Sequence, residues 1–252
     1  MLLAKLEVNG NDYEIEGILF DKDGTLIELH TLWSTWFEHV WKEVKRKQPE
    51  VTCTKEKVSE SIGLDIKNRI ISAKGPLAIG TMEDIAIIIS HHLYLSQLPW
   101  NEAVQTVRNS MKYVHNTIDW NQLLKLVRGL EGFLEKARKS GIKMGVVTSD
   151  DTDIARTHLR LLNIDHFFHA VIGSDQIGLP KPYPDIGYQA CKEMQIDPHH
   201  VVVIGDTNSD MNLGQHLKAK GSIGMLTDES TDEGHLKDAD HVIRHYNQLS
   251  IM

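Results

Sequence analysis

A chain of 252 residues, of which 41% are hydrophobic and 25% charged, can bury one core or a core that carries an inserted domain. Its formal net charge of −8 argues against a nucleic-acid-binding protein, because affinity for a phosphate backbone requires clustered lysine and arginine. Two cysteines without metal-ligand or disulfide spacing, no signal-peptide pattern and a longest apolar run at residues 85–89 predict a cytoplasmic protein that does not enter a membrane.

The first element that the sequence predicts is a β-hairpin over residues 1–16. Polar and apolar residues alternate there around Asn9-Gly10, the strongest short signal for a hairpin turn. The residues that would share its apolar face are Leu6, Val8, Tyr13 and Ile15. We interpret the hairpin as an addition to the core. Its use as a dimerisation edge stays open, as does the choice between a monomer and a homodimer.

The next segment combines a buried strand with two acids. Residues 18–20, Ile-Leu-Phe, predict a core strand, and residues 21–25 read Asp-Lys-Asp-Gly-Thr. Two carboxylates so close are costly unless a cation neutralises them or one holds a proton, which favours a nucleophile with an acid–base partner. Gly24 would let backbone amides turn toward whatever Asp21 holds. An EF-hand is excluded, because leucine occupies its glycine and glutamate positions, and a solvated acidic turn is the simpler alternative.

Residues 30–121 change to helical periodicity with few strand signals. Apolar residues recur at helical spacing in two stripes, which we interpret as the core of a helical subdomain rather than as a cofactor site. The stripes are Leu32, Trp36, Val40 and Val44, and Ile85, Ile88, Leu93 and Leu95. The basic residues within 42–47 are interleaved with Glu43 and Val44 and predict a solvated helix face.

From residue 130 onward, helix-like and strand-like segments alternate. The helix-like segments cover residues 133–140, 154–162 and 186–193, and the strand-like segments cover residues 144–148, 170–172 and 201–204. This alternation predicts a parallel sheet with helices on both faces, to which the strand at 18–20 also belongs. The helical stretch is then an insertion after that first strand.

Three further segments carry side chains suited to phosphate chemistry. Thr148 and Ser149 end an apolar strand, and Lys181 stands in a loop stiffened by three prolines. Asp206 and Asp210 follow another apolar strand. Each feature has a structural alternative: a helix cap for the hydroxyls, an exposed loop lysine, and acids at a helix N-terminus. Their joint occurrence with the acid pair favours one shared site.

The four segments together resemble the four motifs of the haloacid dehalogenase-like hydrolase superfamily: Asp-x-Asp-Gly-Thr, a strand-terminal Thr, Lys-Pro and Gly-Asp-x-x-x-Asp. Residues 173–185 resemble its phosphoglycolate phosphatase-like branch in particular. The resemblance begins at residue 17 and runs to the C-terminus. It implies a Rossmann-like, doubly wound α/β core, residues 1–29 and 122–252, with a helical cap, residues 30–121, inserted after the first strand.

The resemblance also implies a reaction, the Mg²⁺-dependent hydrolysis of a small phosphorylated metabolite through an aspartyl-phosphate. Asp21 would be the nucleophile and Asp23 the general acid and base. Mg²⁺ would be held by the Asp21 side chain, the Asp23 backbone carbonyl and the Asp206 carboxylate, while Asp210 would orient a metal-bound water.

The phosphoryl group would be bound by a second set of groups. Thr148 and Lys181 would donate to its oxygens, together with backbone amides around Asp23, Gly24 and Ser149. Asp175, shortly before Lys181 in the sequence, would steer the lysine.

The residue at position 23 separates activities within the superfamily. Asp23 argues against a dehalogenase, whose halide leaves without a proton, and against a phosphonatase and a cation-pumping ATPase, which carry other residues there. A phosphomutase keeps both acids and stays open, as does a phosphate-binding regulatory protein without turnover. Within the turn-rich stretch at 63–84, Arg69 or Lys74 would contact a carboxylate or second phosphate of the substrate, or would simply be exposed. The sequence does not specify the substrate.

Overall fold

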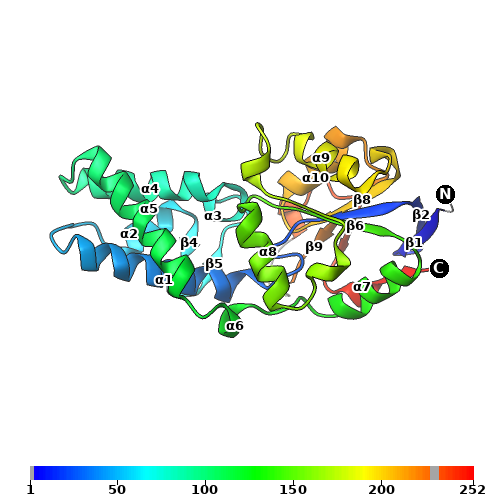
Figure 1. The fold of residues 1–252 in the computed structure, drawn as a ribbon, viewed down its shortest axis with the longest axis horizontal. Helices are drawn as coiled ribbons and strands as arrows, with labels where there is room; N and C mark the ends of the chain where they lie inside the picture. Colours follow the sequence, from blue (N-terminus) through cyan, green and yellow to red (C-terminus); the bar gives the residue numbers. More distant parts are fainter. Residues whose placement is uncertain (1–2, 228–232) are drawn as a thin grey trace. The chain divides into compact units, whose positions relative to one another are not determined.

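The computed structural model describes residues 3–227 and 233–252, and the chain divides into two compact units (Figure 1). The core unit consists of Met1–Glu28 and Leu124–Met252, and the inserted unit consists of Leu29–Leu123. Met1 and Leu2, which belong to the predicted hairpin, lie outside the described residues. Within the described ranges, no helix combines the length and the apolar character that crossing a membrane requires.

The centre of the core unit is a six-stranded parallel sheet in the order β10-β9-β8-β3-β6-β7, which confirms the predicted α/β class. Its strands are β3 (Gly17–Phe20), β6 (Lys143–Val147), β7 (Ala170–Ile172), β8 (Val201–Gly205), β9 (Gly221–Met225) and β10 (His241–Ile243). The central strands β3 and β8 are buried at every position. Strands covered on both faces carry continuous apolar runs, which is why the sequence alone located them.

Helices cover both faces of this sheet. They are α7 (Leu130–Lys139), α8 (Thr152–Leu161), α9 (Asp185–Met194) and α10 (Asn208–Leu217). Leu19 packs in one cluster with Ile186 of α9 and Leu213 of α10. The next residue, Phe20, contacts Phe133 of α7 with ring centroids 6.4 Å apart. Since successive strand residues point to opposite faces, α7 lies on the face opposite to α9 and α10.

The predicted hairpin is confirmed as β1 (Ala4–Val8) and β2 (Asn11–Ile15). Asn9 and Gly10 in its turn both have positive φ, at 51° and 80°, as a two-residue hairpin turn requires. The sequence did not predict β11 (Leu249–Ile251), which pairs with the other side of β1. Because β1 is the middle strand of this three-stranded sheet, the hairpin is tied to the C-terminus of the core unit.

Single turns of 3₁₀-helix complete the core unit. They lie at Asp165–Phe167, Ser174–Gln176, Pro198–His200, Glu233–His235 and Tyr246–Gln248. The last of these turns carries Tyr246, which is almost completely buried and donates its hydroxyl hydrogen bond to the Thr25 carbonyl. Thr25, at the end of the Asp-Lys-Asp-Gly-Thr segment, is thereby held by the C-terminal region of the chain.

The inserted unit is mainly helical, as its periodicity predicts. It contains α1 (Leu29–Lys47), α2 (Lys55–Ser61), α3 (Pro76–Ile79), α4 (Met82–Leu95), α5 (Trp100–Thr117), α6 (Trp120–Leu123) and the short strands β4 (Leu64–Asp65) and β5 (Ile70–Ile71). The predicted stripe of α1 is buried throughout. The prediction for α4 is partly wrong. The buried residues of this helix include Ile85, Ile89 and Leu93, whereas Leu95 of the predicted stripe is 56% exposed. A spacing of four keeps side chains on one helix face, and Leu95 falls outside that spacing.

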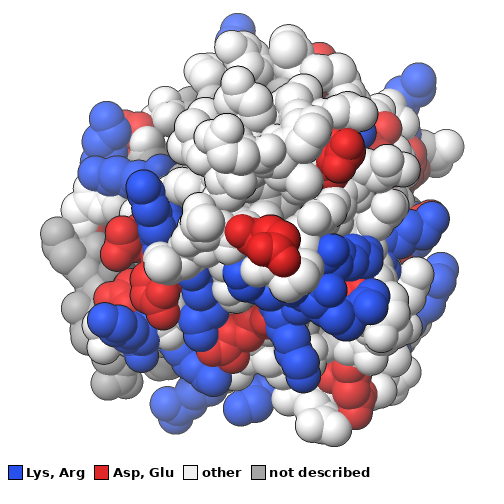
Figure 2. Space-filling model, turned by 90° about the vertical axis from the view of Figure 1, so that its left-hand side faces the viewer, with Lys and Arg blue, Asp and Glu red and all other residues white. Residues whose placement is uncertain are grey.

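The basic end of α1 is a solvated surface in which one carboxylate, Glu43, pairs with two of the cations. Figure 2 views the molecule from the side where α1 ends, and lysine and arginine side chains gather there with acidic side chains between them. Arg46 and Lys47 both form ion pairs with Glu43, and Lys45 donates to the Pro49 and Val51 carbonyls. This arrangement agrees with the predicted solvated helix face.

Candidate active site

The predicted site residues of the core unit follow the carboxyl ends of adjacent strands. Asp21 follows β3, Thr148 follows β6 and Asp206 follows β8, and β3 pairs with both β6 and β8. In open parallel sheets this edge is where ligands bind. The structure therefore brings three sequence-predicted residues to one edge of the sheet.

Lys181 reaches this edge from a loop. Its Nζ donates to Asp21 Oδ1 at 2.5 Å and to Asp210 Oδ1 at 2.7 Å, and lies 3.4 Å from the Val147 carbonyl oxygen. Burial disfavours the Lys181 ammonium, but the nearby Asp21 and Asp210 charges outweigh it and raise the pKa of the lysine. Lys181 is thus a buried ammonium held by two carboxylates rather than an exposed loop lysine.

Three carboxylates converge beside this lysine. Asp21, Asp206 and Asp210 each offer an oxygen, and these oxygens all lie within 4.8 Å of one another. Burial, opposed by Lys181 and reinforced by Asp210, raises the pKa of Asp21 to about 7. Burial and the Asp21 and Asp210 charges also raise the pKa of Asp206 well above its ordinary value. The cluster is electrostatically costly as an assembly of acids alone.

A hard divalent cation fits this cluster. Carboxylate oxygens are the ligands that Mg²⁺ takes in proteins, and a cation among them would favour their ionised forms. The donor chemistry of Asp21, Asp206 and Asp210 therefore matches the metal that the sequence predicts.

Asp210 belongs to the acidic cluster and also caps the N-terminus of α10. Its Oδ2 accepts from the Thr207 hydroxyl at 2.6 Å and from the Thr207 N–H at 3.1 Å, which forms the capping box of α10. Its Oδ1 accepts from Lys181. The helix-terminus alternative is therefore correct for Asp210, and it also explains how Asp210 holds Lys181 rigidly.

Gly24 makes room for Asp206. Its φ is +82°, and a Cβ built on it would lie 2.0 Å from Asp206 Oδ2. The Gly24 N–H donates to the Ile27 carbonyl at 2.7 Å, so this amide is engaged within the turn. Gly24 therefore has a steric role. Because it has no side chain, Asp206 after β8 can approach the turn after β3.

Gly24→Ala is expected to lower the free energy of unfolding by about 1–2 kcal/mol from the backbone conformation alone. It should also weaken the binding of Mg²⁺ to the acidic cluster, because the new methyl group displaces Asp206. Urea denaturation and metal titration measure the two effects. Gly132→Ala, within α7 where a Cβ meets nothing within 4 Å, is the control and should be neutral or stabilising. Wild-type metal dependence in Gly24→Ala would contradict the steric role.

Thr148 and Ser149 occupy the loop between β6 and α8. Thr148 is 2% exposed, and its N–H donates to the Ile172 carbonyl at 3.1 Å. Its Oγ1 accepts from the Asp150 N–H at 3.2 Å, which leaves the hydroxyl proton to be donated elsewhere. Ser149 is half-buried beside it.

Asp175 does not steer Lys181, contrary to the sequence-based expectation. Its Oδ1 accepts from the Thr152 N–H at 2.8 Å and from the Thr152 hydroxyl at 2.7 Å, at the start of α8. The lysine is steered by Asp21 and Asp210. Sequence proximity to Lys181 was misleading, because Asp175 lies on a separate 3₁₀-turn that anchors the loop after β6.

The sequence analysis missed a second buried lysine. Lys22, the middle residue of the Asp-Lys-Asp segment, is fully buried and forms ion pairs with Asp23 and Asp150. Burial disfavours its ammonium, but the Asp150 and Asp23 charges outweigh burial and raise its pKa. The available signal was its place between two acids at the end of a buried strand, where a lysine must find partners.

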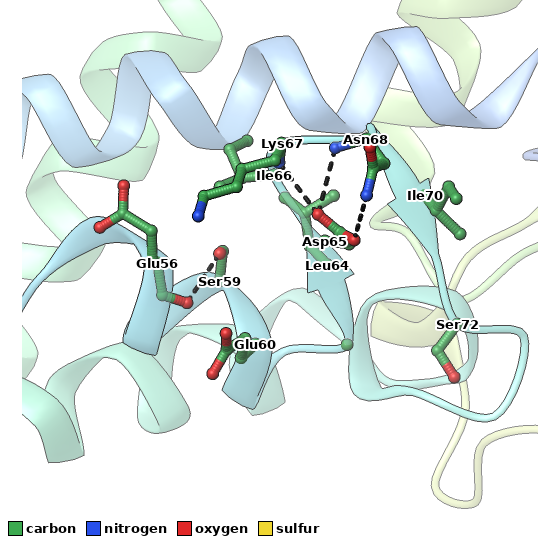
Figure 3. Close-up of a pocket in the computed structure, with 11 residues that line it drawn as sticks. Glu56, Ser59, Glu60, Leu64, Asp65, Ile66, Lys67, Asn68, Ile70 and Ser72 are labelled. Carbon is green, nitrogen blue, oxygen red and sulfur yellow. Dashed lines mark hydrogen bonds between the residues drawn. The ribbon is translucent and has the colours of Figure 1, made fainter.

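Arg69 and Lys74 belong to the inserted unit, where both are exposed. A pocket of about 410 Å³ lies within this unit, between α2 and the turn that joins β4 and β5 (Figure 3). Lys67, Asp65 and Asn68 line it, and Arg69 and Lys74 do not. The Asp65 carboxylate holds that turn by accepting from the Lys67 and Asn68 N–H groups.

The sequence of the chain is similar to those of known hydrolases. Residues 18–221 match the family model of the haloacid dehalogenase-like hydrolases. The chain is 25% identical over 207 residues to pyrophosphatase PpaX of Oceanobacillus iheyensis, covering 82% of this chain and 81% of that protein.

Two crystal structures share the fold. A HAD phosphatase from Thermococcus onnurineus aligns with a TM-score of 0.63 at 20% identity, covering 93% of this chain and 95% of its own. A β-phosphoglucomutase from Clostridium difficile aligns with a TM-score of 0.58 at 19% identity, covering 93% and 92%. With the family model matched across all four motifs, the chain belongs to the haloacid dehalogenase-like hydrolases.

Proposed function

We propose that this protein is a Mg²⁺-dependent phosphatase that hydrolyses a small phosphorylated metabolite through an aspartyl-phosphate on Asp21. The observation that carries the proposal is the buried lysine Lys181, held between Asp21 and Asp210 beside Asp206. One permanent cation beside a carboxylate and an acidic metal site is the arrangement that phosphoryl transfer requires. The similarity to a pyrophosphatase and the shared fold with a HAD phosphatase support it.

The reaction proceeds in two displacements. In the first, an Asp21 carboxylate oxygen forms a bond to phosphorus while the bond to the leaving alcohol oxygen breaks, and Asp23 gives its proton to that oxygen. In the second, Asp23 takes a proton from water, whose oxygen attacks phosphorus and releases inorganic phosphate and the Asp21 carboxylate. Each step is easier than one direct attack by water.

The surrounding groups stabilise the charge that moves in these steps. Thr148, Ser149 and Lys181 donate to the phosphoryl oxygens, where negative charge is present throughout the transfer. Mg²⁺, held by Asp21, the Asp23 carbonyl and Asp206, with Asp210 orienting a water, would offset the repulsion between the carboxylate and the phosphate. Arg69 and Lys74 are our candidates for substrate selection.

The function is tested by measuring inorganic phosphate release from phosphorylated metabolites in the presence of Mg²⁺. Phosphate should appear in amounts equal to the substrate consumed and without a bisphosphate activator. Accumulation of an isomeric sugar phosphate with negligible free phosphate would instead identify a phosphomutase. Binding of phosphate without turnover of any ester would identify a regulatory protein.

Asp23→Asn should separate substrates by their leaving group. An alkyl phosphate needs its leaving oxygen protonated in the first displacement, so kcat/KM, which covers the steps up to departure of the leaving group, should fall by about 10²–10⁴-fold. An aryl phosphate, whose phenolate leaves with less protonation, should lose much less. Steady-state kinetics on both esters check this difference. Equal losses on the two would remove Asp23 from the acid role.

A further inference from the structure

Lys22 is a fully buried cation of the core unit that the two-step mechanism does not use. Its Nζ lies 2.6 and 2.7 Å from the two carboxylate oxygens of Asp23. It also lies 2.9 Å from Asp150 Oδ2 and 3.3 Å from His158 Nδ1. An ammonium only donates, so the histidine nitrogen accepts in this contact. Lys22 thus links the proposed acid–base residue to two groups on other segments.

These two groups are rigidly placed. The Asp150 N–H donates to Thr148 Oγ1, and the Asp150 carbonyl accepts from the Ser174 N–H at 2.9 Å. A Cβ on Gly173 would lie 2.5 Å from the Asp150 carbonyl oxygen, so the backbone is closely packed there. His158 is fully buried on α8. The position of the Lys22 ammonium is therefore determined by the loop after β6 and by α8, independently of Asp23.

We propose that Lys22 is a positioning residue that holds the Asp23 carboxylate in the place from which it exchanges protons with the substrate oxygen and with water. The proposal rests on the proposed phosphatase function. The Asp23 side chain is 15% exposed, and contact of both its oxygens with one fixed ammonium restricts its rotamers. A misplacement of about 1 Å at a reacting group can cost about 10²-fold in rate.

A purely structural ion pair predicts a different result. If Lys22 only stabilised the core, its loss would lower stability and the activity on every substrate in the same proportion. A positioning residue affects the steps that need proton transfer, so its loss should depend on the leaving group. The two roles are therefore distinguished by the ratio of activities on alkyl and aryl esters.

The test compares Lys22→Met, which keeps most of the volume and removes the charge, with Asp150→Asn. In Lys22→Met, kcat/KM, which covers the steps up to departure of the leaving group, should fall by about 10²-fold on an alkyl phosphate, with a much smaller loss on an aryl phosphate. Asp150→Asn keeps an oxygen that can accept from Lys22 in the same place, so the contact between Lys22 and Asp23 is retained and its alkyl-to-aryl ratio should match the wild type. Equal losses on both esters in Lys22→Met would overturn the proposal.

A second measurement does not depend on activity. Lys22→Met leaves Asp150 buried without this cation, so the charge-balanced double variant Lys22→Met/Asp150→Asn is prepared as well. Crystal structures of the wild type and of whichever variants fold should show the Asp23 carboxylate displaced or in several rotamers only where Lys22 is absent. An unmoved carboxylate overturns the proposal. If the wild type hydrolyses no phosphate ester, the proposed function fails, and the crystal structures alone decide whether Lys22 holds Asp23.

Discussion

Asp21→Asn is expected to lower turnover by at least about 10⁴-fold while the fold is retained. The amide has nearly the shape of the carboxylate but cannot attack phosphorus, so the aspartyl-phosphate does not form. Lys181 keeps its second partner, Asp210, and is therefore not left unpaired in the variant. Steady-state phosphate release, together with circular dichroism of the purified variant, measures both parts of the prediction.

The control for this variant is Asp185→Asn. Asp185 is an exposed acid in the first turn of α9, so its replacement removes a carboxylate from the core unit without altering the acidic cluster. It should keep wild-type turnover. Rapid quenching of the wild type with substrate should trap one phosphoryl group on Asp21, detected by mass spectrometry, and Asp21→Asn should trap none. Steady-state hydrolysis retained by folded Asp21→Asn would exclude Asp21 as the nucleophile.

Removal of divalent cations is expected to lower activity by at least about 10³-fold, and added Mg²⁺ should restore it. The same treatment should change stability, because binding of a cation to the folded state alone raises the melting temperature. Asp206→Asn should weaken both responses, since it removes one of the three converging carboxylates. Metal titrations followed by phosphate release and by thermal unfolding provide the measurement.

The metal-free protein should also show a characteristic dependence on pH. Burial raises the pKa of Asp21 from 3.8 to about 7, so between these values the folded state binds more protons than the unfolded state. Stability should therefore fall as the pH rises from about 4 to about 7, on the order of a few kcal/mol, and stay low above that range. Saturating Mg²⁺ should abolish this fall, because the cation favours the ionised acids. The same slope with and without Mg²⁺ would contradict the assignment of the cluster as the metal site.

The chain's local patterns determined four of the six strands of the sheet and the motifs at its edge, whereas β9 and β10 were not predicted. The strands at 18–20, 144–147 and 201–204 are continuous apolar runs that end in polar residues, and this pattern is typical of strands covered on both faces. The hairpin around Asn9-Gly10 was equally local, because two positive φ values select those residues. The hydroxyl, lysine and acid motifs could therefore be predicted at their residues before any contact was known.

Contacts between distant parts of the chain could not be predicted in this way. Lys181 holds an acid 160 residues away, and Lys22 contacts His158 across 136 residues. The C-terminal strand β11 pairs with β1, although nothing in the sequence of either strand indicates its partner. Apolar periodicity reports that a residue is buried, but it does not report which group faces that residue, since this depends on how the strands and loops pack.

The sequence by itself therefore determined the fold class, the strand-end acids and the single lysine of the proline-rich loop. The tertiary structure alone decided that Lys181 lies between Asp21 and Asp210, that Asp175 anchors α8, and that Gly24 leaves space for Asp206. It also decided that Lys22 is a buried partner of Asp23 rather than an incidental residue between two acids. The physical reason is that a charge acquires its role from its partners and its burial, and both are set only when the sheet edge assembles.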